Sequence, residues 1–103
     1  MRDILQEEIE RLQQLIASYD VQIQALPKGS ISWKQRGRRR YAYRAYREVN
    51  TVRFEYLGKS ESEKTEAFSM EMERRRELEG KRKAALRRLR QAERMLRAAD
   101  NDV

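Results

Sequence analysis

The sequence contains no cysteine and no histidine among its 103 residues. Disulfides, cysteine nucleophiles, zinc sites built from Cys and His, and Ser–His–Asp triads are therefore excluded. Proline occurs once and glycine four times, which argues against a wholly disordered chain. No apolar run approaches the length of a membrane span, and the segment that follows Met1 does not resemble a signal peptide. We therefore expect a soluble, cytoplasmic protein.

Charge is abundant and unevenly distributed. Charged residues make up 40% of the chain and hydrophobic residues 39%, a mix that suits helices burying only one stripe each. The 24 Lys and Arg against 17 Asp and Glu give a net charge of +7, and the excess lies in the middle third. The length fits one small domain, so we expect residues 1–103 to form a single domain.

The first segment carries a coiled-coil repeat. Its apolar residues are separated alternately by four and three positions, an average of about 3.5 residues. Pro27 lacks an amide hydrogen and disfavours helical geometry at the residue before it, so we predict a helix over 3–26. The predicted seam consists of Leu5, Ile9, Leu12, Ile16, Tyr19, Ile23 and Leu26.

From Ile31 the apolar period changes to two. Turns are expected at Gly37-Arg38 and near Val49-Asn50-Thr51, which predicts a three-stranded antiparallel meander over 30–58. One face of this sheet is expected to pack against the helices and to bury Trp33; it would carry Ile31, Trp33, Tyr41, Tyr43, Val52, Phe54 and Tyr56. The other face is expected to be polar and solvent-facing, with Lys34, Arg36, Arg40, Arg44 and Arg53.

A second helix is predicted over 61–99, with Ser60 or Ser62 as its N-cap and a possible bend near Gly80. It would be much longer than the first helix, so its seam residues Leu89 and Leu96 would extend beyond their partner. Either this helix breaks near Gly80 or a second chain covers the overhang. The combination of Ile at a with Leu at d is found in parallel dimers, and we expect a homodimer whose seam includes Leu89 and Leu96.

The carboxylates lie mostly on solvated helix surface, and no pair sits in an apolar setting suited to acid–base catalysis. Gly58-Lys59-Ser60 is similar to the end of a phosphate-binding loop, but that motif needs a glycine where this chain has Arg53. We interpret these three residues as a strand exit and a helix cap. We expect no enzymatic activity, no cofactor, no metal, no membrane and no small-molecule substrate.

The basic sheet is the most informative feature of the sequence. From Lys34 to Arg47 there are seven cations and no acid, interleaved with four aromatic residues. Arginine binds phosphates and guanine edges and stacks on bases, which favours a nucleic-acid-binding sheet. An acidic protein surface or a merely solvated face is the alternative. The candidate contact residues are Lys34, Arg36, Arg38, Arg39, Arg40, Arg44, Arg47 and Arg53.

The middle of the chain contains a distinctive series of short motifs: Leu26-Pro27-Lys28-Gly29-Ser30, Gly37, Tyr41-Ala42-Tyr43-Arg44, Tyr46-Arg47-Glu48 and Tyr56-Leu57-Gly58-Lys59. With these motifs the chain resembles a family of small uncharacterised proteins of bacteria and their phages. In that family a leading helix, a basic hairpin and a trailing charged helix follow in this order, so the resemblance implies the architecture and a mobile-element setting.

A fainter similarity links Gly29 to Phe68 with the arm-site DNA-binding domain of tyrosine integrases, a three-stranded sheet followed by a helix. That resemblance implies a sheet placed in the major groove, without a catalytic domain. Its contact candidates would be Lys34, Arg36, Arg40, Arg44 and Arg53.

The sequence thus predicts an α+β protein, in which two long coiled-coil-like helices flank a small three-stranded antiparallel sheet. The preferred function is that of a non-catalytic nucleic-acid-binding accessory protein of a phage or mobile element. One alternative is a small protein-binding inhibitor, for example an anti-CRISPR-like protein that blocks a nuclease or its DNA channel. Another is a structural coiled-coil assembly module.

Overall fold

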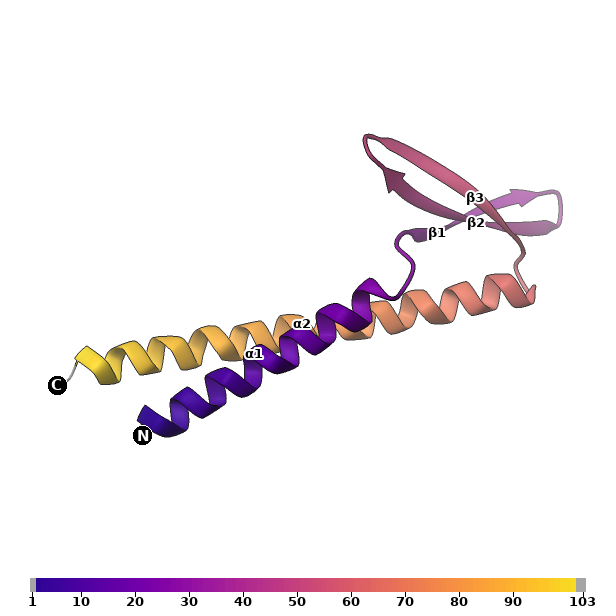
Figure 1. Cartoon of the computed structure of the whole chain (residues 1–103). Helices are drawn as coiled ribbons and strands as arrows, with labels where there is room; N and C mark the ends of the chain where they lie inside the picture. The colour runs from indigo at the N-terminus through magenta and orange to yellow at the C-terminus, as the bar shows by residue number, and fades with distance from the viewer. Residues whose placement is uncertain (1, 102–103) are drawn as a thin grey trace. The chain divides into compact units, whose positions relative to one another are not determined.

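The computed structural model describes residues 2–101. Two helices and three strands follow one another in the predicted order (Figure 1). The three strands form one antiparallel sheet in the order β1-β2-β3, so the chain has the expected α+β architecture. The elements are α1 (Arg2–Gln24), β1 (Ser30–Arg36), β2 (Arg39–Glu48), β3 (Thr51–Lys59) and α2 (Glu63–Asn101).

These elements belong to two compact units. The first, which we call the helical unit, contains the chain up to Ala25 and from Glu77 onward. The second, the sheet unit, is Leu26–Arg76 and holds the three strands with the first part of α2. That the two fold together as a single domain over 1–103 stays a prediction.

In the helical unit, the apolar stripe of α1 packs on α2. Leu12 and Ile16 form a buried cluster with Ala85, because the spacing of four and three places them on one side of α1. Ion pairs join Arg2 to Asp100 and Asp20 to Arg82, so the start of one helix lies beside the end of the other. The two helices are therefore an antiparallel pair.

The seam predicted for an oligomer is largely occupied within one chain. Leu5 and Ile9 are buried like Leu12 and Ile16, and the flanks of the cluster include Tyr19 and Leu89. The intramolecular pair thus accounts for most of the coiled-coil repeat, and the homodimer stays a prediction. The remaining seam residues are half-buried: Ile23, Leu26 and Leu96.

Helix α2 begins after a capping residue and continues without a break. The amide of Thr65 donates a hydrogen bond to the Ser62 hydroxyl at 3.2 Å, so Ser62 caps the helix. The interpretation of Gly58-Lys59-Ser60 as a strand exit is confirmed, because β3 ends at Lys59, but the helix cap is Ser62 and not one of these three residues. Gly80 lies inside the helix and is exposed, so of the two alternatives for the overhang, a break near Gly80 does not occur.

Replacing Gly80 with alanine should stabilise the protein. A Cβ added at Gly80 meets no atom within 4 Å, so alanine would fit there without a clash. We expect Gly80→Ala to raise the free energy of unfolding by about 0.5–1 kcal/mol, because glycine loses more backbone entropy in a helix. Urea denaturation checks this; a lower midpoint for the variant would mean that α2 needs a bend at this position.

The register of the sheet differs from the predicted grouping of side chains. A two-residue turn joins β1 to β2, and it places Trp33 opposite Ala42 and Ile31 opposite Arg44. Directly opposite residues of an antiparallel pair lie on the same face. Trp33 and Ile31 are therefore on the other face from Tyr43, and their predicted grouping with the tyrosines is wrong. In a hairpin with a two-residue turn, each odd-numbered residue of one strand lies opposite an even-numbered residue of the other. The prediction instead placed odd-numbered residues of both strands on one face.

One side of the sheet packs on the first part of α2, and we call it the helix-facing side. Its core consists of Ala42 and Leu57 packed with Phe68 of α2; the exposed fractions of these side chains are 0%, 7% and 6%. Leu57 is the extra residue of a β-bulge, since Tyr43 pairs with Tyr56 and Ala42 pairs with Gly58. The partly buried residues around this core are Ile31 and Met72.

The opposite side, which we call the open face, carries most of the aromatic residues that were expected in the core. Phe54 is 55% exposed and Tyr56 is 50% exposed. The prediction of a buried aromatic face is therefore wrong, because α2 packs on the other side of the sheet. By register and alternation the open face consists of Lys34, Arg36, Arg39, Tyr41, Tyr43, Arg47, Val52, Phe54 and Tyr56.

The different exposure of two large aromatic residues at the helix-facing side predicts different effects on stability. Phe68→Ala should cost roughly 3–5 kcal/mol of unfolding free energy, because it leaves a cavity in the core of the sheet unit. Trp33 is 40% exposed, so Trp33→Ala should cost no more than about 1 kcal/mol. Parallel urea titrations test the pair, and a larger loss for Trp33→Ala than for Phe68→Ala would contradict the exposed position of Trp33.

Candidate nucleic-acid interface

The register divides the predicted contact residues between the two sides of the sheet. Arg40, Arg44 and Arg53 lie on the helix-facing side, because they are opposite Gln35, Ile31 and Tyr46. The expectation that these arginines share one face with Lys34 and Arg36 is therefore wrong. Arg38 lies in the turn between β1 and β2. The open face keeps Lys34, Arg36, Arg39 and Arg47.

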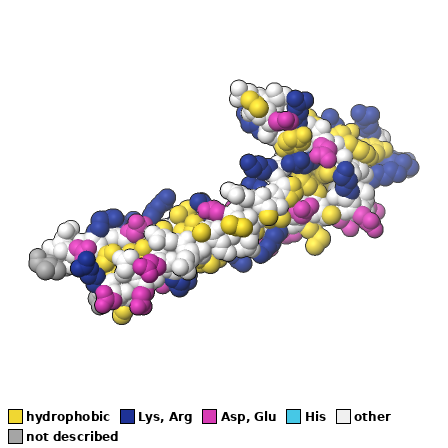
Figure 2. All heavy atoms as spheres, viewed as in Figure 1, with side chains coloured by type: hydrophobic (Ala, Val, Ile, Leu, Met, Phe, Trp, Pro, Cys, Tyr) yellow, Lys and Arg dark blue, Asp and Glu magenta, His cyan; other side chains and the backbone are white. Residues whose placement is uncertain are grey.

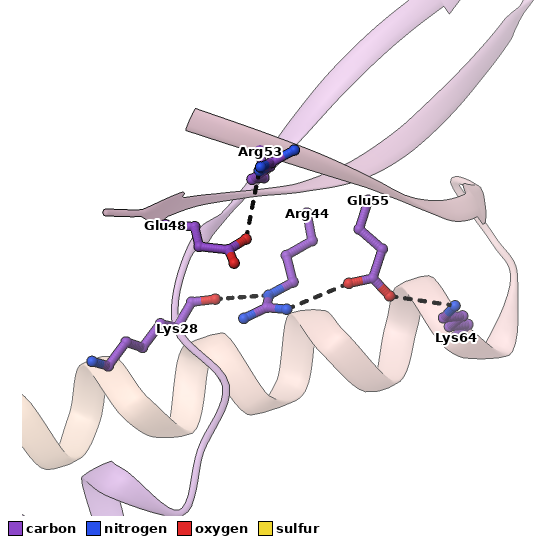
Figure 3. A network of polar contacts seen from close by, with 6 residues as sticks. All are labelled: Lys28, Arg44, Glu48, Arg53, Glu55 and Lys64. Carbon is purple, nitrogen blue, oxygen red and sulfur yellow. Dashed lines mark hydrogen bonds and ion pairs between the residues drawn. The ribbon is translucent and has the colours of Figure 1, made fainter. Parts of the chain in front are cut away.

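The arginines of the helix-facing side meet carboxylates and a carbonyl (Figure 3). The Nε of Arg44 donates to the carbonyl oxygen of Lys28 at 2.8 Å, and its Nη1 lies 3.4 Å from Glu55 Oε2. Glu55 also lies 3.9 Å from the ammonium of Lys64 at the start of α2. Arg44, which was expected to face solvent, therefore ties the segment before β1 to the strands.

Both acidic residues of the strands belong to this network. Arg53 Nε is 3.5 Å from Glu48 Oε2, across the turn that joins β2 to β3. Glu48 and Glu55 thus lie on the helix-facing side, each beside an arginine. The positive charge of that side is partly neutralised.

Trp33 and Arg40 form a separate contact on the helix-facing side. The guanidinium carbon of Arg40 lies 4.5 Å from the centroid of the Trp33 ring, a cation–π arrangement. Trp33 is therefore a half-exposed residue covered by an arginine, not the buried core residue that was expected. Arg44 covers Tyr46 in the same way at 4.2 Å.

The open face combines cations with half-exposed aromatic rings. The ammonium of Lys34 lies 4.9 Å from the Tyr43 ring centroid and 5.5 Å from that of Phe54. The Tyr56 ring is tilted against that of Tyr43, with centroids 5.3 Å apart. Figure 2 shows hydrophobic and basic side chains lying side by side over the part of the molecule that carries the strands. This face carries no acidic side chain between Ser30 and Lys59.

Among the hollows at the strands of the sheet unit, two include Arg36 or Arg39 of the open face in their lining. The smaller one, about 340 Å³, is lined by Arg36, Tyr41, Tyr43 and Tyr56. The larger one, about 620 Å³, lies where the β1–β2 turn meets the connection from β3 to α2. The backbone amide of Ser60 donates to the carbonyl of Arg40 at 3.1 Å and holds these two segments together. The residues around the larger hollow are Arg38, Arg39, Arg40, Lys59, Ser60, Glu61 and Ser62.

Sequence reasoning missed the aromatic residues of this site, because it placed them in the core. Tyr41, Tyr43, Phe54 and Tyr56 all belong to the open face. The spacing of the Gly37-Arg38 turn was the available signal, since a two-residue turn determines which residues of β1 and β2 share a side.

Residues 2–101 offer neither a metal site nor a membrane-spanning helix. The described residues contain no group of three or more side chains that could hold a metal ion. In the same range, no helix is long and apolar enough to cross a membrane.

The different surroundings of Arg44 and Arg36 predict different effects on stability. Arg44→Ala should lower the free energy of unfolding by about 1–3 kcal/mol, because it removes charge-assisted hydrogen bonds and leaves the Lys28 carbonyl without this donor. Arg36→Ala is the matched control on the open face and should stay within about 0.5 kcal/mol of the parent protein. Thermal and urea unfolding compare the two; equal losses would show that Arg44 is not a structural residue.

Comparison with known proteins assigns the chain to a family. No curated protein and no solved structure matched the chain. A family model described as a domain of unknown function, DUF6788, matches residues 2–67, which is more than half of the chain and includes α1 and all three strands. The protein therefore belongs to the DUF6788 family.

Proposed function

We propose that this protein binds nucleic acid, without catalysis, through the open face of its sheet. The observation that carries the proposal is the sorting of charge between the two sides. Glu48 and Glu55 lie on the helix-facing side next to arginines, whereas all charged side chains of the strands on the open face are cations. A surface of one sign next to aromatic rings suits a polyanion that also offers flat bases.

The cations of the open face have few competing partners. Lys34, Arg36 and Arg47 are exposed, and the described part of the chain offers none of them a carboxylate within ion-pairing distance. Binding a phosphate would therefore not require breaking an internal ion pair. Arg53 differs, because it would have to leave Glu48. Phosphate contacts are thus expected from the open face rather than from all eight basic residues singled out in the sequence.

The larger hollow continues this basic surface at one end of the sheet. Arg39 belongs both to the open face and to the lining of this hollow. Lys59 and Arg38 add positive charge there, against Glu61 as the only acid in the lining. A nucleic-acid backbone that follows the open face would find its next phosphate contacts at this place.

The biological setting of the proposal is an accessory role in a phage or another mobile element. It is supported by the resemblance of the basic hairpin described above. The coiled-coil helices would serve as the scaffold that carries the sheet. A homodimer is part of the same proposal and would present two such sheets to one ligand.

The salt dependence of binding tests the proposed face directly. We expect Lys34→Ala/Arg36→Ala to reduce the slope of log K against log salt by about 1.4 to 1.8 per sheet, since two phosphate contacts are lost. The matched control is Arg53→Ala/Lys64→Ala, which removes one lysine and one arginine from the sheet unit outside the open face. It should leave the slope nearly unchanged. Fluorescence anisotropy with a labelled oligonucleotide measures both.

Two results would contradict the proposal. An equal loss of slope in both double variants would mean that binding follows net charge and has no preferred face. No association of the parent protein with single-stranded or duplex nucleic acid at about 50 mM salt would leave an acidic protein surface as the ligand of the open face. In that case the protein-binding inhibitor would become the better account.

A further inference from the structure

We infer that the preferred ligand of the open face is single-stranded nucleic acid, with an unpaired base held in the hollow between Arg36, Tyr41, Tyr43 and Tyr56. This inference rests on the proposed function and names its ligand class.

The ring of Tyr56 is parallel to neither of the two tyrosine rings that line the hollow with it. The Tyr56 ring makes an angle of 57° with Tyr43 and of 44° with Tyr41, at centroid distances of 5.3 Å and 6.3 Å. Rings tilted in this way do not cover each other's faces, so a ring face remains available for stacking. The hollow that they line together with Arg36 measures about 340 Å³ and is open to solvent.

The ammonium of Lys34 occupies a position over the aromatic rings that a stacked base would take. This ammonium sits 4.9 Å from the Tyr43 centroid and 5.5 Å from the Phe54 centroid, in front of the electron-rich ring faces. A base that stacks on Tyr43 would take this place and move the flexible lysine aside. The displaced ammonium could then pair with the phosphate of the same strand, so the cation–π contact would be exchanged for an ion pair.

A duplex would make poor use of this surface. In a duplex the flat faces of the bases are stacked on one another, and only their edges and the phosphates can be reached. Arg44 and Arg53 lie on the helix-facing side beside Glu55 and Glu48, so a duplex could be contacted only by Arg36, Arg39 and Arg47 together with Lys34. A duplex would therefore contact the cations of the open face and leave its aromatic rings unused.

The test compares ring removal on the two sides of the sheet. Tyr56→Leu removes a ring of the hollow but keeps an apolar side chain, and Tyr46→Leu makes the same change on the helix-facing side. The probes are a labelled oligothymidylate of about 15 nucleotides and a duplex of the same length. Circular dichroism and thermal unfolding establish that each variant is folded; Tyr41→Leu, which removes another ring of the hollow, is used instead if Tyr56→Leu is not.

We expect the parent protein to bind the oligothymidylate more tightly than the duplex at the same salt concentration. Tyr56→Leu should raise the dissociation constant for the single strand roughly 5- to 150-fold, the range that corresponds to the loss of one stacked base. Its affinity for the duplex should stay within about twofold, because phosphate contacts are unchanged. Tyr46→Leu should leave both affinities unchanged.

The outcomes separate the inference from the function on which it rests. Duplex binding that equals or exceeds single-strand binding, with no effect of Tyr56→Leu, would overturn the single-strand inference and leave the nucleic-acid function in place. Equal losses in Tyr56→Leu and Tyr46→Leu would also overturn it, since the effect would not belong to the hollow. No binding of either probe at about 50 mM salt would refute the proposed function itself.

Discussion

The register set by the two-residue turns of the sheet is the constraint on which the candidate site depends. The turn at Gly37-Arg38 has a positive φ of 62° at its first central residue, a conformation that glycine adopts without steric cost. With this turn, Ala42 lies opposite Trp33 and shares the helix-facing side with Leu57, where both can pack with Phe68. Shifting the register by one residue would turn the small Ala42 outward and a tyrosine toward α2. The tight packing at Ala42, which is fully buried, leaves no room for that alternative.

The turn between β2 and β3 is held by a different means. Val49 has a positive φ of 56°, which is unfavourable for a β-branched residue. The ion pair between Glu48 and Arg53 spans this turn and links the two strands at its base. At the other end of β3, the bulge at Leu57 restores an apolar contact with α2. The β2–β3 connection thus carries an ion pair at its turn and an apolar anchor at the far end of β3.

The same register sorts the charges of the sheet. Strands alternate their side chains, so the positions of Glu48 and Glu55 determine which arginines are neutralised. Both acids lie on the helix-facing side, and there they stand beside Arg53 and Arg44. The open face is left with cations and with rings that are about half exposed. The proposed function follows from this division rather than from the net charge of +7, which is shared by both sides and by the helices.

The architecture could be read from the sequence, whereas the identity of the exposed face could not. The heptad repeat of α1, the stop at Pro27 and the change of period at Ile31 are local patterns, and the elements they predicted are present. Which side of a strand faces a helix is a tertiary property, because both sides of β2 are rich in apolar or aromatic side chains. The oligomer seam illustrates the same point. An apolar stripe such as the one that contains Leu12 and Ile16 indicates that a partner helix packs there, but it does not say which helix. Here the partner is α2 of the same chain.

Spectra of the arginine side chains during a nucleic-acid titration test the central claim most directly. The Nε–Hε groups of arginine give separate ¹H–¹⁵N signals that respond to a nearby phosphate or base. When an oligothymidylate is added to the full chain, the signals of Arg36, Arg39 and Arg47 should shift, and those of Arg44 and Arg53 should not. Shifts confined to Arg44 and Arg53 would contradict the account, because they would place the ligand on the side of the sheet that packs on α2.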